Sequence, residues 1–296
     1  MAAVPEQMRQ ANLARVGNLH LRVGDESAAN TAGRRVWARL ISVDRQVDQG
    51  GTVQPASDGR LSGLQAGTDL WASRDWKLGL YVAQLDGDVD VSGFARGISG
   101  YAAGTNDIRN QYLGAYATWA DPQGAYVDGV LQGGRHRTSV EPAQLMARSV
   151  RGHSALASLE IGKAWRGVSN WFVEPQVQVA YQRLDVDDAM LPGATVRQDA
   201  ANSWMLRLGV RVGGEIGTSA GVLMPYARLN YYRGSSGSDI ASFIGPAGST
   251  DIATRTGGAS AELAAGATWR LTPRTSMYGE IGKLWSVSGE TDVGSN

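Results

Sequence analysis

One short segment of the chain has the G-x-S-x-G pattern that carries the serine nucleophile of many esterases, Gly217-Thr218-Ser219-Ala220-Gly221. That pattern works on a turn from a strand into a helix, and it needs an Asp and a His further along the chain. Here it lies between two predicted strands, and all three histidines precede it, at His20, His136 and His153. We interpret the segment as a turn, and we expect neither catalytic residues nor an enzyme.

The composition gives no support for a metal, a cofactor or a nucleic-acid partner. The chain has no cysteine, and its histidines lack the spacing of metal ligands. Lys+Arg and Asp+Glu both number 28, so the chain has none of the basic surplus that nucleic-acid binding requires. We therefore expect no metal site, no cofactor and no bound nucleic acid.

Many charged side chains instead alternate with apolar ones along predicted strands. The simplest interpretation is a hydrated interior in which these charges form salt bridges. A sharper hypothesis is that some of the acids bind Arg9, Arg15 or Arg22 of an N-terminal helix, because charge-assisted bonds are strong in a low-dielectric interior. The charged residues expected to face inward are Arg39, Asp69, Asp128, Glu160, Glu174, Arg207, Arg211, Arg228, Glu262 and Glu280.

From Arg34 onward the side chains alternate with the period of a β-strand, most clearly in residues 171–182. The predicted strands are about 10 to 15 residues long, whereas strands of globular proteins are usually nearer 5–6 and tilted membrane strands need about 9–11. We predict eleven strands, at 34–44, 60–72, 76–91, 107–120, 125–138, 150–165, 171–186, 201–216, 219–233, 254–271 and 275–288.

The connections between these strands alternate in length. The short ones are 73–75, 121–124, 166–170, 217–218 and 272–274, and the long, mostly polar ones are 45–59, 92–106, 139–149, 187–200 and 234–253. Transmembrane barrels show this asymmetry, with short periplasmic turns and long extracellular loops. The sequence therefore predicts an all-β, antiparallel up-and-down transmembrane barrel whose first strand runs outward from the periplasm.

Tryptophan and tyrosine supply most of the aromatic side chains, as expected for residues at a membrane–water interface. Candidates for such a girdle are Trp76, Trp119, Trp171, Trp269, Tyr181 and Tyr231, although ordinary strand packing would explain any one of them equally well.

Residues 5–23 are predicted to form a polar helix, followed by a flexible connector at 24–33. About 18 residues would make a helix of roughly 27 Å, close to the apolar thickness of a bilayer. It could thread a polar pore with its N-terminal end toward the cell exterior, or lie in solvent. We expect two regions, a linker with a pore-spanning helix at 1–33 and a barrel at 34–296.

An eleventh strand would end on the outside, where residues 289–296 follow it. Because single-chain bacterial barrels normally have an even number of strands, we expect that one closing strand is missing.

Several of these segments together resemble the C-terminal β-barrel, or translocator domain, of type V secretion autotransporters of the classical monomeric, pertactin-like family. The segments are Val36–Arg39, Leu64–Trp71, Tyr112–Trp119, Tyr126–Gln132, Phe172–Gln178, Pro225–Tyr231 and Tyr278–Gly282. The resemblance implies about twelve strands around a lumenal helix, with a passenger domain N-terminal to that helix. It also implies a monomer that contacts outer-membrane lipid and lipopolysaccharide and is inserted by the barrel assembly machinery.

The chain departs from the family in two respects. Family members end in a strand with a C-terminal aromatic residue, whereas this chain ends at Asp292-Val293-Gly294-Ser295-Asn296. The predicted helix also lacks the Asn-Asn pair at which one branch of the family cleaves itself, so we predict no self-cleavage.

We therefore expect an outer-membrane protein that exports and anchors an N-terminal passenger. A porin or solute channel is the alternative, but it would need an open lumen and has no reason to begin with a polar helix of pore length. An outer-membrane enzyme and a soluble adhesive β-sandwich are weaker hypotheses.

Overall fold

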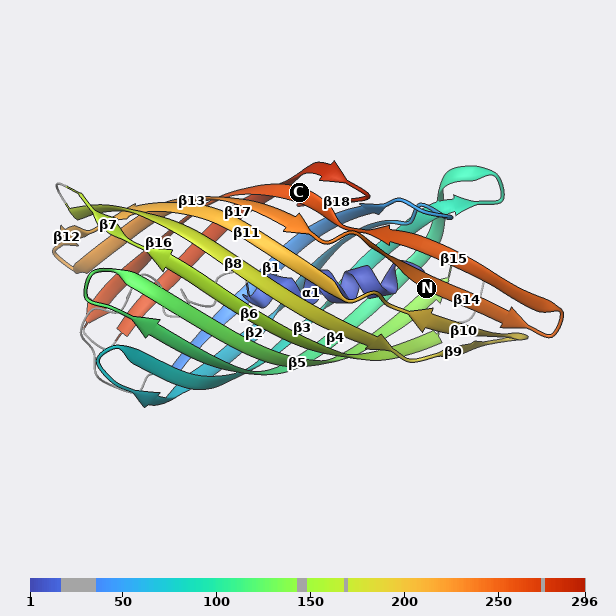
Figure 1. The fold of residues 1–296 in the computed structure, drawn as a ribbon, viewed down its shortest axis with the longest axis horizontal. Coiled ribbons are helices and arrows are strands. Elements are labelled where there is room, and N and C mark those ends of the chain that lie inside the picture. The colour runs from blue at the N-terminus through green and yellow to red at the C-terminus, as the bar shows by residue number, and fades with distance from the viewer. Residues whose placement is uncertain (17–35, 143–147, 168–169, 273–274, 296) are drawn as a thin grey trace.

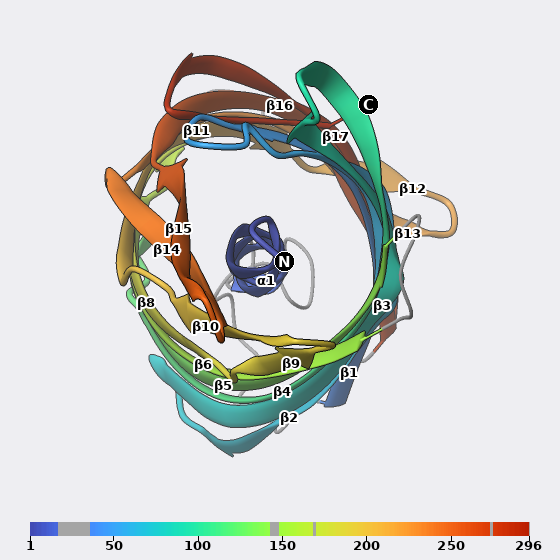
Figure 2. The same cartoon turned by 90° about the vertical axis from the view of Figure 1, so that its right-hand side faces the viewer.

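The computed structural model describes residues 1–16, 36–142, 148–167, 170–272 and 275–295. Long antiparallel strands wind around a central helix, as the view down the barrel shows (Figure 2). The wall is formed by β1 (Val36–Gln49), β2 (Ala56–Ala72), β3 (Trp76–Ala95), β4 (Ile98–Ala120), β5 (Ala125–Pro142), β6 (Arg148–Lys163), β8 (Trp171–Val186), β11 (Ser203–Gly214), β13 (Gly221–Gly234), β16 (Gly258–Thr272), β17 (Thr275–Gly289) and β18 (Thr291–Gly294).

From β1 to β17, wall strands that are consecutive along the chain pair with each other, and β18 pairs with β1. The order is β17-β16-β13-β11-β8-β6-β5-β4-β3-β2-β1-β18. Short strands β7 (Trp165–Arg166) and β12 (Ile216–Thr218) pair with β8 and β13 at the end where the connections are short. The predicted fold class, an antiparallel up-and-down barrel with an N-terminal helix in its lumen, is confirmed (Figure 1).

The seam between the first and last long strands is held at the end of the long connections. There β18 pairs with residues 46–49 of β1, and Ser295 donates its backbone N–H to the Leu284 carbonyl of β17 at 3.0 Å. Within the described residues, positions 36–45 of β1 pair with β2 alone. The missing closing strand remains a prediction.

The long connections differ from the predicted irregular loops. Residues 187–200 contain β9 (Ala189–Leu191) and β10 (Ala194–Asp199), and residues 234–253 contain β14 (Gly237–Gly245) and most of β15 (Gly248–Thr256). These strands form a second sheet in the order β15-β14-β10-β9, which extends beyond one end of the barrel (Figure 1). Their polar composition conceals the strand pattern, because the sheet buries only a few apolar side chains against the helix.

The second sheet also contacts the seam of the barrel. The backbone of Gly50 accepts a hydrogen bond from Arg255 at 2.9 Å, and the guanidinium of Arg255 lies 2.8 Å from the Glu290 carboxylate in the connection from β17 to β18. The hydrogen bond to Glu290 raises the pKa of Arg255. The β14–β15 hairpin therefore reaches across to both strands that flank the seam.

Burial follows the alternation in the sequence, with the polar face inside. Along β8, Glu174, Gln176 and Gln178 are buried, whereas Val173 and Val177 are exposed on the outer surface. This is the reverse of a water-soluble sandwich and is the pattern of a barrel that faces lipid.

Helix α1 (Val4–Val16) lies inside the barrel. The predicted continuation of the helix to residue 23, the connector at 24–33 and the boundary between the two predicted regions lie outside the described residues. In the described part of the chain, no helix is long and apolar enough to cross a membrane.

Candidate functional site in the barrel lumen

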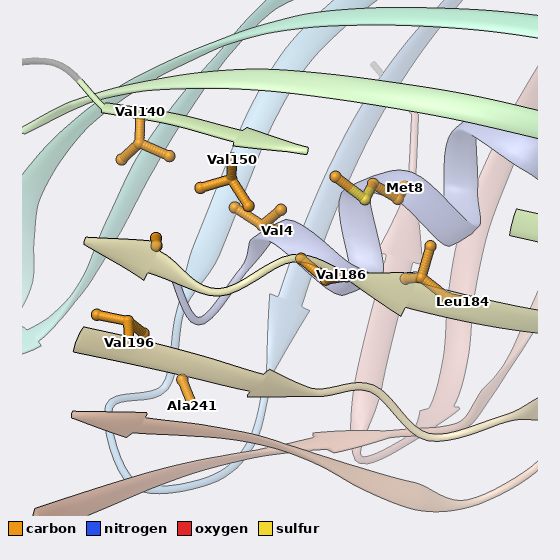
Figure 3. Packing of buried hydrophobic residues seen from close by; sticks show 9 residues of the cluster. Val4, Met8, Val140, Val150, Leu184, Val186, Val196 and Ala241 are labelled. Carbon is orange, nitrogen blue, oxygen red and sulfur yellow. The ribbon is translucent and has the colours of Figure 1, made fainter. Parts of the chain in front are cut away.

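The N-terminal half of α1 is anchored by an apolar cluster at the end of the barrel that carries the long connections. Val4 and Met8 are fully buried, and they pack against barrel side chains that include Val150 and Leu184 (Figure 3). The second sheet contributes Ala189 of β9, Val196 of β10 and Ala241 of β14, and the barrel wall also contributes Val140 of β5 and Val186 of β8. The helix is therefore held between the barrel wall and the extra sheet.

Gly152 on β6 shows how closely the helix approaches the wall. A Cβ at this position would lie 3.3 Å from Sδ of Met8 and 2.9 Å from the backbone oxygen of Asp185. The space for the Met8 side chain thus depends on the absence of a side chain at Gly152.

A buried ion pair fixes the same half of the helix. Nη1 of Arg9 lies 2.7 Å from Oδ2 of Asp239 in β14, and Nη2 donates to Oδ1 of the same carboxylate. Arg9 also donates to Glu6 at 3.0 Å and to the Ala201 carbonyl at 3.0 Å. Both side chains of the Arg9–Asp239 pair are 3% exposed. Such a two-pronged contact is among the stronger and more directional side-chain interactions.

Amide side chains position the middle of the helix. Gln7 donates to Oγ of Ser57 at 3.1 Å and accepts from Asn106 at 2.8 Å. Asn12 is fully buried, donates to Gln182 at 3.1 Å and accepts from Ser154 at 3.2 Å. These bonds reach four different strands, so they determine the rotation of the helix about its own axis.

His136 supports the contact at Asn12 from the barrel wall. Its Nε2 lies 2.7 Å from Oγ of Ser154, and its Nδ1 lies 2.8 Å from Oδ1 of Asn110. The imidazole therefore helps to position Ser154 for the helix.

The C-terminal end of α1 lies deeper in the barrel, toward the short turns. Val16 packs in a cluster with Trp37, Tyr81, Tyr116, Val130 and Leu156. Gln178 donates to the Val16 carbonyl at 3.5 Å. The helix thus has its N-terminal end near the long connections and its C-terminal end within the lumen.

Most of the predicted inward-facing charges pair with one another, either between adjacent strands or across one intervening strand. Arg207 lies 2.8 Å from Glu160, Arg211 lies 3.1 Å from Glu174, and Arg228 lies 2.8 Å from Glu280 and 3.3 Å from Glu262. The Arg211 guanidinium also lies 4.7 Å from the ring centre of Phe172.

The other predicted inward-facing charges bind neutral partners. Asp69 accepts from the Tyr116 hydroxyl at 2.6 Å, and Asp128 accepts from Thr118. Arg39 donates to Gln65 at 2.7 Å and is half-buried.

Of the three helix arginines predicted to bind acidic side chains, one can be compared with the structure. Arg9 binds Asp239, which is in a predicted long connection and is not one of the ten inward-facing charges predicted on the barrel strands. The side chain of Arg15 and the whole of Arg22 lie outside the described residues. Asp239 could not be singled out from the sequence, because residues 234–253 contain two carboxylates, Asp239 and Asp251, and no local pattern distinguishes them.

The sequence pattern does predict that two of the polar partners of the helix point into the lumen. Gln178 and Gln182 fall on the polar face of the clearest predicted strand. The alternation indicated that these side chains point inward, but it did not indicate that a helix receives them.

The lumenal contacts described above are those of a docked helix. Ser219 lies in a two-residue turn between β12 and β13, where Thr218 pairs with Gly221. In the part of the chain that the structure describes, no group of three His, Asp or Glu side chains could hold a metal ion.

Aromatic residues flank the outer apolar surface. Trp76 and Trp119 face each other on β3 and β4 next to a short turn, and Trp171 and Trp269 lie beside other short turns. Toward the other end, the Tyr181 ring lies 4.7 Å from Trp204, and Tyr231 is exposed on β13. Their positions are those expected of two interfacial girdles.

Comparison with known proteins identifies related chains. A profile of the autotransporter β-domain family matches residues 36–282. The pertactin autotransporter of Bordetella bronchiseptica is 28% identical over 251 residues, which cover 82% of this chain and 26% of the relative. The BrkA autotransporter of Bordetella pertussis is 29% identical over 234 residues, which cover 73% of this chain and 20% of the relative. The chain thus spans about a quarter or less of the length of these relatives.

Solved structures share the fold. The β domain of the Bordetella autotransporter BrkA superposes with a TM-score of 0.64 and 22% identity, covering 89% of this chain and 95% of that one. The transport unit of the autotransporter AIDA-I from Escherichia coli superposes with a TM-score of 0.66 and 17% identity, covering 97% and 95% of the two chains.

Proposed function

The chain belongs to the autotransporter β-domain family, and from this premise we propose that it is the outer-membrane translocator of a longer protein, which exports a passenger domain and anchors it at the cell surface. The family match covers most of the barrel and agrees with the resemblance seen in the sequence. The activity of such a protein resides in its passenger, so we assign no catalytic step to this chain.

The docked helix is the observation that carries this proposal. Its N-terminal end lies beside β9, β10 and β14, at the end with the long connections, and its C-terminal end points toward the short turns. Long connections are extracellular in barrels of this kind. A polypeptide that precedes the helix would therefore emerge at the cell exterior, while the helix leads back through the lumen to the barrel.

A porin or solute channel fits the geometry less well. The helix occupies the centre of the barrel, and Arg9, Asn12 and Met8 are almost completely buried in its contacts with the wall and the second sheet. Conduction of solutes would require this helix to leave.

The remaining parts of the proposal concern partners. We place the barrel as a monomer among outer-membrane lipid and lipopolysaccharide, and we expect insertion by the barrel assembly machinery. The outer surface supports the lipid environment, because large apolar side chains such as Leu40 and Ile281 are more than four-fifths exposed on it.

Surface display in Escherichia coli tests the export function. A signal peptide and an epitope-tagged, cysteine-free reporter would be fused ahead of Met1, and intact cells would be treated with protease. We expect the reporter to be removed by external protease while the folded barrel is protected, because the helix directs the preceding chain outward.

Heat-modifiable gel migration of the barrel provides the folding control. A reporter that stays in the periplasm, although the barrel is folded in the outer membrane, would contradict the proposed export. A reporter attached at a short turn, for instance after Gln123, should remain protected and calibrates the assay.

A further inference from the structure

The outer surface carries a basic patch that the docked helix does not use. It consists of Arg109 on β4, Arg135 and Arg137 on β5, and Arg151 and His153 on β6, all of them exposed. These three strands are neighbours in the wall of the barrel (Figure 2).

Strand register places the arginines of the basic patch in one row. Arg137 is directly opposite Arg109 on one side and directly opposite Arg151 on the other. Arg135 is opposite His153 in the adjacent row. Like charges that face each other directly across strands destabilise a sheet, so this row has a cost unless an anion lies over it.

Carboxylates neutralise only the margins of this region. Nη2 of Arg109 lies 3.4 Å from Oδ2 of Asp107, and on β8 the neighbouring Arg183 lies 3.3 Å from Asp185. Asp86 of β3 also lies opposite Arg109. No carboxylate of the described residues forms an ion pair with Arg135, Arg137 or Arg151. On the β6 side, Asp185 lies opposite His153, and the backbone N–H of Asp187 binds the Arg151 carbonyl, so two exposed carboxylates flank that edge. The positive charge farthest from any carboxylate is therefore that of Arg135 and Arg137 on β5.

The basic patch lies at one border of the apolar surface. Leu113, Leu131 and Leu159 are exposed on the same outer faces of β4, β5 and β6, on the side toward the short turns. Trp119, near the opposite border, is ten positions from Arg109 on β4. At about 3.4 Å per residue and a tilt of about 40°, this separation corresponds to a height of roughly 26 Å, close to the apolar band of about 25 Å in such barrels. The arginines thus lie at the level of lipid headgroups on the side of the long connections.

We propose that the basic patch binds the phosphate groups of a phosphorylated lipid in the outer leaflet, with the acyl chains of that lipid lying over Leu113, Leu131 and Leu159. The guanidinium group suits this ligand, because its planar array of donors matches two phosphate oxygens at once. The proposal rests on the outer-membrane location proposed above. An acidic protein partner fits less well, because the apolar surface that continues below the arginines faces acyl chains.

Lipid binding to the full chain in neutral detergent, followed by native mass spectrometry, tests this site. The probe is lipid A in its phosphorylated form, compared with chemically dephosphorylated lipid A and with inorganic phosphate. We expect the unaltered protein to retain the phosphorylated lipid preferentially. We expect Arg137→Gln/Arg151→Gln to reduce its affinity about thirtyfold, since each basic residue near an anionic surface contributes roughly a factor of five.

The matched control is Arg74→Gln/Lys163→Gln, which removes the same charge near the short turns and should leave lipid retention unchanged. Arg137→Lys/Arg151→Lys keeps the charge but loses the paired donors, so its affinity should lie between those of the unaltered protein and of Arg137→Gln/Arg151→Gln. Equal retention of phosphorylated and dephosphorylated lipid by the unaltered chain would overturn the proposal, whatever the folding of the variants. So would competition by millimolar inorganic phosphate, which would indicate a site for free anions, or equal losses in the two charge-removal variants.

The surface-display assay separates this proposal from the proposed function. Lipid retention by a barrel that fails to display its reporter would refute export and leave the lipid site standing. Normal display by a barrel without phosphate-dependent retention would refute the lipid site alone.

Discussion

At the residue scale, Arg9 and Asp239 show how a single contact can control the docking of the helix. They are 230 positions apart in the chain, and they join the helix to the β14–β15 hairpin inside a nearly dry environment. Breaking a buried ion pair by removing one partner costs about 3–5 kcal/mol, because the remaining charge is left without compensation.

The substitution Asp239→Asn tests the ion pair. It preserves the shape of the side chain and leaves Glu6 as the remaining anion beside Arg9. We therefore expect the free energy of helix docking to fall by about 2 kcal/mol, less than the full cost of an uncompensated buried charge. Protease sensitivity of the helix in the folded barrel, measured as a rate of cleavage, reports this change. The control is Asp251→Asn, which removes an exposed carboxylate from the same hairpin and should have little effect. Equal protection of the helix in Asp239→Asn and the unaltered protein would show that the apolar cluster suffices.

At the element scale, the helix and the second sheet depend on each other. Val4 and Met8 of α1 share one apolar cluster with Val196 and Ala241 of the second sheet. The sheet buries few apolar residues of its own, so its arrangement over the lumen requires the helix as a partner.

Deletion of residues 1–16 tests the helix as a plug. We expect the deleted barrel to keep its strands but to conduct ions, because the lumen that it leaves is lined by hydrated polar side chains. Single-channel recordings in planar bilayers should show a small, unstable conductance for the full chain and a large, steady one after deletion. A large, steady conductance in both proteins would refute the plug and favour the channel hypothesis. Unchanged heat-modifiable migration establishes that the deleted barrel is folded.

At the scale of the whole molecule, the outward apolar surface determines where the barrel is stable. Leu159 is 55% exposed on β6, between Lys163 near the short turns and Arg151 at the opposite border of the apolar surface. A side chain at this level has acyl chains around it in a bilayer, whereas one beyond Arg151 reaches headgroups or water.

The substitution Leu159→Arg tests this placement. A charged residue near the middle of a bilayer costs a transmembrane barrel about 2–4 kcal/mol, and near its interfaces about 0–1 kcal/mol. Because Leu159 lies inside the apolar band, we expect Leu159→Arg to destabilise the barrel in lipid vesicles by clearly more than the interfacial amount, measured by equilibrium unfolding in urea. Ser149→Arg, on the same outer face of β6 but beyond Arg151, should cost about 1 kcal/mol or less. Equal costs at the two positions would be inconsistent with the proposed level of the membrane.

Much of this architecture could be predicted from the sequence, because local patterns determine it. The strict alternation in residues 171–182 determines which side chains share a face of β8, since successive residues of a strand point to opposite sides. The alternating lengths of the connections then determine the up-and-down order of the strands. Several strands extend well beyond their predicted ends, most of all β4, which begins at Ile98 whereas the predicted strand begins at residue 107.

Other features could be decided only by the tertiary structure. Nothing local to residues 234–253 distinguishes a polar loop from β14 and part of β15, because these strands gain their stability from contacts with a helix more than 200 positions away. For the same reason, the pairing of Arg9 with Asp239 depends on how the helix docks. The row of basic side chains depends on strand register, which places Arg109, Arg137 and Arg151 opposite one another. Local alternation determines the face on which a side chain lies, whereas its partner depends on how distant segments of the chain meet in space.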